Sequence, residues 1–230
     1  MNVLVIDVGG TNVKVLATGQ KEPRKFPSGP KLNPKQMVSG VKKITSDWKY
    51  DVVSMGYPGV VSKGKPAVEP HNLGHPWVGF DFKTEFGCPV KIINDAAMQA
   101  LGSYKEGLLL FLGLGTGLGA ALVDQGIIIP LEVGHLPYKK KTYEDYLGLR
   151  GLERMGKKKW KNYVEHGVSS LINAFHPDDV VIGGGNAKKL KSLPSGCRRG
   201  DNGNAFLGGF RLWEEADNHR PPIGAKARSK

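Results

Sequence analysis

The sequence predicts an α/β protein made of two similar lobes, and three observations support this fold class. Residues 4–16 are strand formers interrupted by two glycines and a threonine, which indicates a strand, a tight turn and a second strand. Residues 108–123 repeat the pattern, and a shift of 105 positions places Gly10 and Thr11 on Gly115 and Thr116. The 230 residues are enough for two lobes of about a hundred residues each.

The first strand ends in an acid beside a glycine turn. Residues 3–6 are all apolar, as in a strand buried on both faces, and Asp7 follows where that strand would end. We expect Gly9 and Gly10 to adopt positive φ, so that their N–H groups and the hydroxyl of Thr11 can hold a phosphate. A carboxylate next to a phosphate implies Mg²⁺ between them. The alternative is an ordinary glycine hairpin with a solvated acid.

The second turn, Gly115 to Gly117, lacks the acid, because Leu112 stands where the first copy has Asp7. The two lobes are therefore expected to be duplicated but not equivalent, with a metal only on the first. We place the first lobe at residues 1–106 and the second at 107–230, and expect 216–230 to be a loose tail.

Helices and strands alternate along the rest of the chain. Apolar spacing predicts a helix at 34–48, strands at 51–56 and 89–93, and a helix that begins near residue 96. Residues 19–34 are expected to be an exposed connection. In the second half we expect a strand at 127–129, a helix at 160–175, a strand from 180 that opens a helix through a third glycine turn, and a last helix at 202–213.

Two polar residues, Asn94 and Asp95, close a predicted buried strand just before a helix. Either one could simply be the N-cap of that helix, which is a common position for both residue types. This alternative does not explain why two such residues close a strand in a chain with two phosphate-binding turns.

Two loops contain side chains that could recognise hydroxyl groups. Asn72 lies in the proline- and glycine-containing loop 69–77, and its amide can donate and accept a hydrogen bond at once. Trp77 of this loop is expected to pack onto the core. Glu132 and His135 follow the strand expected at 127–129 and offer an acceptor and a donor. Each residue alone is a weak signal.

The chain is strongly basic, with a formal net charge of +12 and an isoelectric point near 9.6. Residues 139–161 contain nine basic and three acidic residues. The net charge of this segment, +6, is half of the total for the chain. Such a run is usually a solvated face, but its density also suits an anionic partner. The basic residues just beyond the third glycine turn add to it: Lys188, Lys189, Lys191, Arg198 and Arg199.

We expect a cytoplasmic protein without a membrane partner. No apolar run approaches the eighteen or so residues of a membrane span, and the chain starts with a strand rather than a signal sequence. Cys88 and Cys197 are far apart, so neither a zinc site nor a disulfide framework is expected.

Six motifs occur in an order that resembles the ROK sugar kinases. They are Asp7-Val-Gly-Gly-Thr-Asn-Val-Lys14, Asn72-Leu, Ile93-Asn-Asp-Ala, Leu114-Gly-Thr-Gly-Leu-Gly, Glu132-Val-Gly-His and Ile182-Gly-Gly-Gly. Most ROK proteins have a cluster of zinc-binding cysteines shortly after the Glu-x-Gly-His motif, and the corresponding residues 136–144 of this chain contain no cysteine. Together with the stretch Leu147-Gly-Leu-Arg-Gly-Leu-Glu-Arg, this absence resembles the polyphosphate glucokinase branch.

The resemblance implies an actin-like fold of two ribonuclease-H-like lobes around a central cleft, and transfer of a phosphoryl group to a hexose. Glucose would be phosphorylated at its 6-hydroxyl, by inorganic polyphosphate, ATP or both, with Mg²⁺. Asp95 would be the general base, and Asp7 would lie on the metal side. The other hydroxyl groups would be bound by Gly59, Asn72, Asn94, Glu132 and His135. Phosphates would be bound by Gly9, Gly10, Thr11, Lys14, Gly115, Thr116, Gly117, Gly183, Gly184 and Gly185, and a polyphosphate chain also by Lys157, Lys158, Lys159 and Lys161.

Two other classes are less favoured. A ROK-type transcriptional regulator would need a helix-turn-helix, and the chain begins at its first phosphate-binding strand. A nucleic-acid-binding protein would explain the charge, but apart from Trp160 no aromatic residues interleave with the basic run as stacking requires. An ATP-only hexokinase of other sugar specificity and a non-catalytic sugar sensor remain alternatives. The resemblance also implies a homodimer and no nucleic-acid partner.

Overall fold

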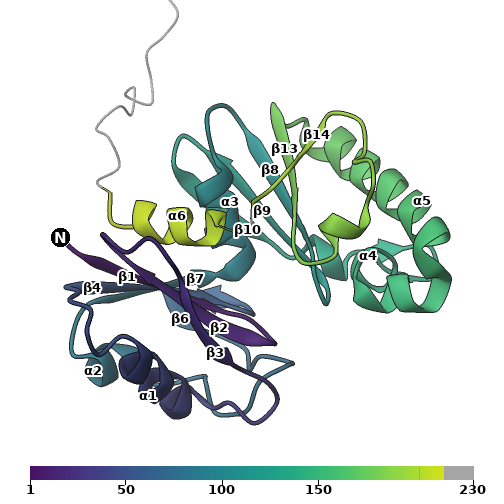
Figure 1. Cartoon of the computed structure of the whole chain (residues 1–230). Helices are drawn as coiled ribbons and strands as arrows, with labels where there is room; N and C mark the ends of the chain where they lie inside the picture. Colours follow the sequence, from purple (N-terminus) through teal and green to yellow (C-terminus); the bar gives the residue numbers. More distant parts are fainter. Residues whose placement is uncertain (202, 215–230) are drawn as a thin grey trace, which may run out of the picture.

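The computed structural model describes residues 1–201 and 203–214, and it contains two five-stranded sheets with helices on both faces of each (Figure 1). The tail expected at 216–230 lies outside the described residues, as does residue 202 at the expected start of the last helix.

The first sheet has the strand order β3-β2-β1-β4-β7. The first three strands form an antiparallel meander, whereas β4 runs parallel to β1 and β7 runs parallel to β4. The bounds are β1 Val3–Val8, β2 Asn12–Ala17, β3 Arg24–Pro27, β4 Val52–Tyr57 and β7 Val90–Asn94.

The second sheet repeats this topology in the order β10-β9-β8-β13-β14. Again three strands form a meander, and two further strands extend it in parallel. The predicted duplication therefore covers a whole sheet, not only the glycine turn. The bounds are β8 Leu109–Leu114, β9 Leu118–Asp124, β10 Ile127–Leu131, β13 Asp179–Gly183 and β14 Cys197–Arg199.

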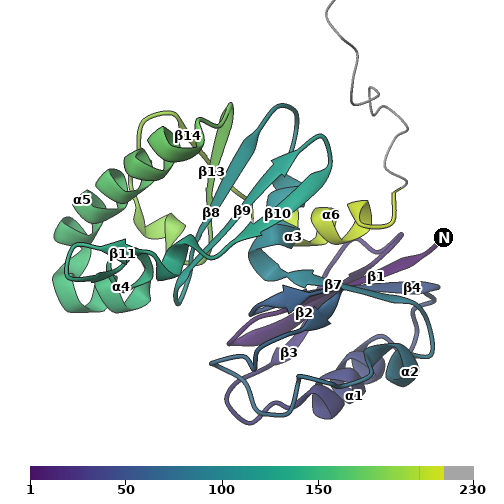
Figure 2. The same cartoon turned by 180° about the vertical axis from the view of Figure 1, so that it is seen from behind.

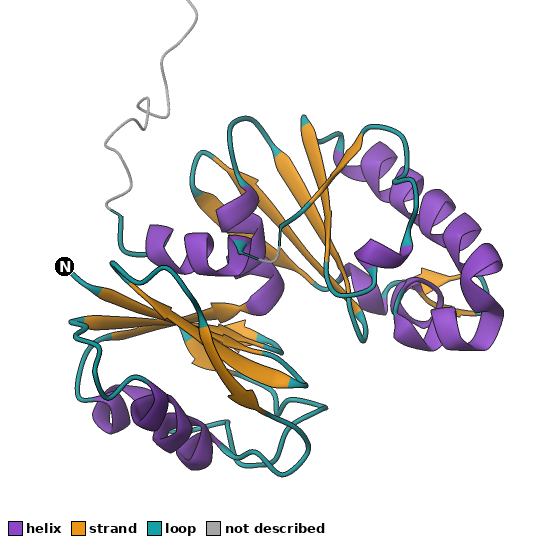
Figure 3. Cartoon of the chain, in the orientation of Figure 1, coloured by secondary structure: helices purple, strands orange, loops and turns teal. Residues whose placement is uncertain are grey.

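The helices are arranged in layers around the two sheets (Figures 1 and 2). Helices α1 (Pro34–Ile44) and α2 (Phe82–Phe86) cover one face of the first sheet. Helices α4 (Tyr143–Leu147) and α5 (Leu149–Phe175) cover one face of the second. Between the two sheets lie α3 (Asp95–Ser103) and α6 (Asn204–Arg211), as Figure 3 shows.

Short elements complete the fold. Two small hairpins are formed by β5 (Val61–Ser62) with β6 (Lys65–Pro66) and by β11 (Pro137–Tyr138) with β12 (Lys141–Thr142). Single 3-10 turns, η1 and η2, span Val133–His135 and Ala187–Lys189.

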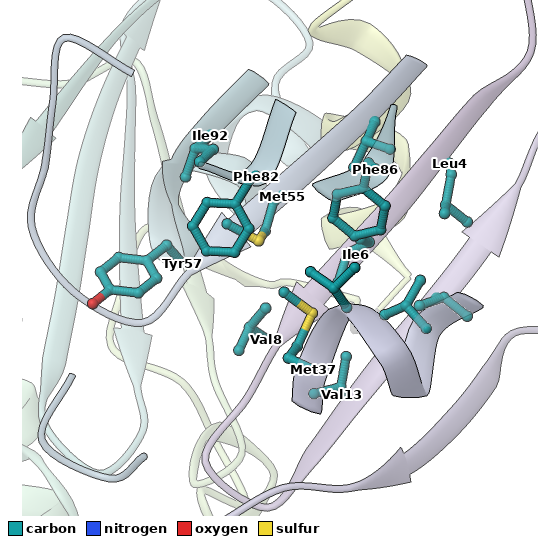
Figure 4. Close-up of a cluster of buried hydrophobic side chains, with 14 of the residues drawn as sticks. Leu4, Ile6, Val8, Val13, Met37, Met55, Tyr57, Phe82, Phe86 and Ile92 are labelled. Atoms are coloured by element: carbon teal, nitrogen blue, oxygen red, sulfur yellow. The ribbon is translucent and has the colours of Figure 1, made fainter. Parts of the chain in front are cut away.

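The strand β1 is buried on both faces, as its continuous apolar run predicts. On one face, Leu4, Ile6 and Val8 pack with Met37 of α1 and with residues of β4, as Figure 4 shows. On the other face, Val3 and Val5 pack with α6. Because packing on both faces fixes this strand, the position of Asp7 near its end is well defined.

Several expected elements differ from those observed. The expected connection at 19–34 contains β3, a mostly polar edge strand that lacks an apolar repeat. The third glycine turn opens only the single turn η2, since the chain there soon meets Pro194 and Gly196. The helix expected at 160–175 begins at Leu149 and has a non-helical residue, Gly156 (φ 73°, ψ 160°). The helix expected at 34–48 ends at Ile44.

The helices α3 and α6 approach so closely that only glycine fits at their contact. A Cβ atom on Gly208 would lie 1.8 Å from the carbonyl oxygen of Met98, and one on Gly102 would lie 1.8 Å from that of Asn204. In addition, Arg211 of α6 donates to the carbonyls of Leu101 and Tyr104 at the end of α3. The last described helix, α6, is thus packed between the two sheets. The division of the chain into two lobes at residue 106 stays a prediction.

This contact predicts that Gly208→Ala is destabilising. In an open helix the change would stabilise by about 1 kcal/mol, because alanine is the better helix former. Here a backbone oxygen occupies the space, so we expect the free energy of unfolding to fall by about 3 kcal/mol, measured by urea denaturation. The exposed Leu207 on the same helix is the control, and Leu207→Ala should change stability by about 0.5 kcal/mol or less. A stabilised Gly208→Ala protein would show that the helices are not in contact.

Candidate active site

The predicted site residues of the first lobe meet at the carboxyl ends of its three parallel strands. Asp7 of β1 pairs with Gly56 of β4, and Gly56 pairs with Ile93 of β7. A Cβ atom on Gly56 would lie 3.5 Å from the Cα of Asp95. Open α/β sheets bind their ligands at this edge. The strand register therefore brings Asp7 and Asp95 to one edge of the sheet.

Of the two residues that close β7, Asn94 is the cap of α3. Its Oδ1 accepts hydrogen bonds from the N–H groups of Ala96 (2.9 Å) and Ala97 (3.1 Å), and its Nδ2 donates to the carbonyl of Gly59 (3.1 Å). Asp95 accepts only at Oδ1, from Ala96 (2.8 Å). In the described part of the chain, its Oδ2 has no hydrogen-bond partner. Capping is thus done by Asn94, which leaves Asp95 an oxygen for another task.

The carboxyl group of Asp95 has a pKa of about 7, well above its usual value. The main cause is the loss of hydration among the protein atoms around it, although the residue keeps part of its surface accessible. The negative charge of Asp7 raises the pKa further, the hydrogen bond from Ala96 opposes it, and the charge of Glu132 adds a smaller increase. A carboxylate tuned close to neutral pH suits proton transfer.

Asp7 is paired with Lys14 across the β1–β2 ladder. The two residues are directly opposite in register, and Nζ of Lys14 lies 3.4 Å from Oδ2 of Asp7. Burial raises the pKa of Asp7, and the charge and hydrogen bond of Lys14 oppose this rise. The predicted phosphate residue Lys14 therefore contacts the predicted metal residue, with 42% of its side chain exposed.

The donor set at Asp7 fits a magnesium ion that is shared with a phosphate. Mg²⁺ is commonly bound by one or two carboxylates together with substrate phosphates and water. Among the described residues there is no group of three or more His, Cys, Asp or Glu that could form a complete metal cage. A single acid beside a glycine turn is consistent with a magnesium ion that is also bound by a substrate phosphate and water.

The first glycine turn is tight, but for a different reason from the one expected. Neither Gly9 nor Gly10 has a positive φ, so that expectation is wrong. A Cβ atom on Gly9 would lie 2.9 Å from the carbonyl oxygen of Asn12, and one on Gly10 would lie 3.5 Å from Cβ of Asn72. Glycine is thus required at Gly9 by the close approach of the backbone, whereas a side chain at Gly10 would make only an ordinary van der Waals contact with Asn72. In the described structure, no hydrogen bond uses the N–H groups of Gly10 or Thr11.

The second and third glycine turns lie side by side, because β8 and β13 are parallel and Gly113 pairs with Gly183. Nδ2 of Asn186 donates to the carbonyl of Gly115 (2.8 Å), which joins the two turns. Gly184 has a φ of 82°, and a Cβ atom there would lie 2.5 Å from the carbonyl oxygen of Leu114. Asn186 was not predicted, although it directly follows the third glycine turn.

Three of the candidate hydroxyl-binding residues, Asn72, Glu132 and His135, are exposed, whereas Gly59 and Asn94 are half-buried. Asn72 lies next to Gly10, which links its loop to the first turn. Glu132 and His135 have 53% and 65% of their side chains exposed, and Oε2 of Glu132 lies 3.8 Å from Nδ1 of His135. The turn η1 contacts β9, and β9 contacts α3, the helix that begins at Asp95. Trp77 is buried, as expected.

The basic residues fall into two groups. Lys157, Lys158 and Lys159 are exposed and follow the break in α5 at Gly156, whereas Lys161 donates to the hydroxyl of Ser192 (2.8 Å). The two arginines expected to add to this face instead form internal contacts. Arg198 pairs with Asp179, and Arg199 donates to the carbonyls of Ala187 and Leu190.

The chain matches the model of the ROK family over residues 3–144. It is 28% identical, over 206 residues, to the polyphosphate glucokinase of Mycobacterium tuberculosis (strain CDC 1551 / Oshkosh), a match that covers 80% of this chain and 77% of the relative. Among solved structures, an inorganic polyphosphate/ATP-glucomannokinase from Arthrobacter sp. strain KM superimposes with a TM-score of 0.79 at 22% identity, covering 92% of this chain and 97% of that one.

A ROK family glucokinase from Streptomyces griseus, solved in complex with glucose and AMPPNP, superimposes with a TM-score of 0.75 at 15% identity. The match covers 92% of this chain and 99% of the Streptomyces griseus glucokinase. These likenesses confirm the expected two-lobe sugar-kinase fold. Within the described residues, no helix is long and apolar enough to cross a membrane.

Proposed function

The chain belongs to the ROK family, and from this premise we propose that it transfers a phosphoryl group to the 6-hydroxyl of glucose, with polyphosphate as a donor. The names of its relatives support a phosphotransferase that acts on a hexose. The choice of glucose and of polyphosphate is our inference from those names and from the charges of this chain.

The observation on which the proposal depends is the state of Asp95. Its pKa is about 7, Asn94 has taken over the capping of α3, and Oδ2 of Asp95 has no partner among the described residues. A group with these properties can accept a proton from a hydroxyl that binds against it. A residue that only capped the helix would lie at the position of Asn94 and accept the hydrogen bonds that Asn94 accepts.

Phosphoryl transfer needs mainly correct positioning and neutralisation of charge. Asp95 would take the proton of the attacking hydroxyl, while Asn72, Glu132 and His135 would hold other hydroxyl groups of the sugar. The N–H groups of Gly10 and Thr11 on one lobe, and the turn Gly115 to Gly117 on the other, would bind the phosphates. Asp7 would hold Mg²⁺, which supplies positive charge to the transferred phosphate when bound.

Polyphosphate suits this chain because its exposed lysines exceed what a nucleotide needs. Lys157, Lys158 and Lys159 lie on α5, the helix whose first N–H group, that of Leu149, donates to the carbonyls of Gly115 and Thr116. The donor turn is thus hydrogen-bonded to the start of α5, and the lysines follow the break at Gly156 further along the same helix. A long polyanion can contact both, whereas ATP has only three phosphates.

The test is an assay of the purified protein with Mg²⁺ and a panel of hexoses, with either ATP or polyphosphate as the donor. We expect glucose 6-phosphate to form, and omission of Mg²⁺ to abolish its formation. The absence of any sugar phosphate with either donor would refute the kinase. Turnover of another hexose alone, or use of ATP alone, would retain the reaction class and correct the substrate. The expected homodimer can be checked by light scattering of the same sample.

A further inference from the structure

A cluster of aromatic rings lies next to the turn η1. We call it the tyrosine cluster, and it consists of Tyr138, Tyr143, Tyr146, Tyr163 and His166. Tyr138 is its centre, and its ring centroid lies 4.5 Å from that of Tyr143, 5.3 Å from that of Tyr146, 6.4 Å from that of Tyr163 and 5.8 Å from that of His166. The rings come from β11, α4 and α5, so the cluster joins three elements. Ring pairs at such distances stabilise beyond the area that they bury.

Tyr138 is fixed at both ends of its side chain. Its ring is buried, with 6% of the residue exposed, and its hydroxyl shares a hydrogen bond of 2.9 Å with Nδ1 of His166. Burial raises the pKa of Tyr138 to about 12, so the hydroxyl stays protonated at neutral pH. Because His166 lies on the long helix α5, this bond ties β11 to the most extended element of the second lobe.

The cluster is connected to η1 through the backbone. The N–H of Leu136 donates to the carbonyl of Val133 (3.1 Å), and the N–H of Tyr143 donates to the carbonyl of Leu136 (3.1 Å). Gly134 packs against β9, since a Cβ atom there would lie 2.8 Å from the carbonyl oxygen of Leu118. A shift of Tyr138 would therefore move the backbone that presents Glu132 and His135.

Glu132 and His135 depend on this backbone for their position. Both side chains are more than half exposed, and the contact between them, at 3.8 Å, is longer than a hydrogen bond. We propose that the tyrosine cluster fixes the turn η1, with Tyr138 and His166 as positioning residues that set how Glu132 and His135 meet the sugar. The identity of the sugar rests on the proposed function, whereas the fixing of the turn does not.

The first test is kinetic. Tyr138→Phe removes the hydroxyl and keeps the ring, so we expect the KM for glucose to rise about fivefold, the value of one hydrogen bond, while kcat and the donor KM change by less than about twofold. Tyr104→Phe is the matched control, because the Tyr104 hydroxyl also has a hydrogen bond, from the N–H of Gln125 (2.9 Å), but lies away from η1. It should leave the KM for glucose unchanged. In His166→Gln, which retains a polar partner, the KM should rise less than in His166→Leu.

The second test does not need activity. Hydrogen exchange of the backbone amides of residues 133–136 should become about tenfold faster in Tyr138→Leu and His166→Leu, and should not change in Tyr104→Phe. If Tyr138→Leu does not fold, His166→Leu gives the same readout. Unchanged exchange together with an unchanged KM for glucose would overturn the inference. A wild-type protein without kinase activity would refute the proposed function, and faster exchange in the variants would still support the positioning.

Discussion

Asp95→Asn should lower kcat for glucose phosphorylation about a hundredfold or more, which is the usual contribution of a positioned general base. An amide has nearly the same shape as a carboxylate but cannot take up the proton of the attacking hydroxyl. Helix α3 should remain intact, because Asn94 provides the cap. The measurement is steady-state kinetics with saturating glucose and donor, together with a melting curve of each protein.

Stability separates a catalytic role from a structural one. The folded pKa of Asp95, about 7, lies above the usual value for an aspartate. Ionisation of this group therefore opposes folding once the pH exceeds its unfolded pKa, and the cost is complete above pH 7. The neutral Asn avoids that cost, so the Tm of Asp95→Asn at pH 8 should equal or exceed that of the wild type. A lower Tm with normal kcat would make Asp95 a structural residue.

A control variant and a pH profile add to this test. Asp81 is an exposed aspartate that caps α2, and Asp81→Asn should leave kcat unchanged because asparagine also caps a helix. In the wild type, kcat/KM for glucose should decrease as the pH falls below about 7 and Asp95 of the free protein becomes protonated. The residual activity of Asp95→Asn should not follow that pH profile.

The duplicated glycine turns were predictable because their signal is local. Each is a short apolar strand followed by glycines, and the strand pattern is visible within ten residues of Asp7 or Gly115. The short edge strands β3 and β14 were not predictable in the same way. Each is polar and is defined by pairing with a neighbouring strand, so its own residues have no apolar repeat. The packing of α6 on β1 also depends on residues about two hundred positions apart.

At the site, residue types were predictable but their individual partners were not. The sequence allowed either Asn94 or Asp95 to cap α3, and only the hydrogen bonds distinguish them. Likewise, a sequence shows the charge of Arg198 but not that Asp179 already pairs with it. The roles of the hydroxyl- and phosphate-binding residues remain predictions, because they depend on ligands.

The use of polyphosphate predicts a steep dependence on salt that ATP should not share. Each phosphate neutralised by a cationic side chain releases a counterion, which contributes about 0.7 to the slope of log KM against log salt concentration for a single-stranded polyanion. If Lys157, Lys158 and Lys159 each bind one phosphate, changing all three to Ala should lower that slope by about two. A fourfold increase in salt would then raise the polyphosphate KM about twentyfold less in the variant than in the wild type.

A matched variant removes the same net charge from another surface. Lys35, Lys42 and Lys43 are exposed on α1, which covers the first sheet. Changing these three to Ala should leave the slope for polyphosphate as it is in the wild type, because only the α5 lysines would contact the polyanion. Both triple variants lose the same net charge, so a difference between their slopes cannot come from general charge. The KM for ATP should respond weakly to salt in all three proteins. If the α5 variant and the α1 variant gave the same slope, the lysines of α5 would be a solvated face, and ATP would become the preferred donor.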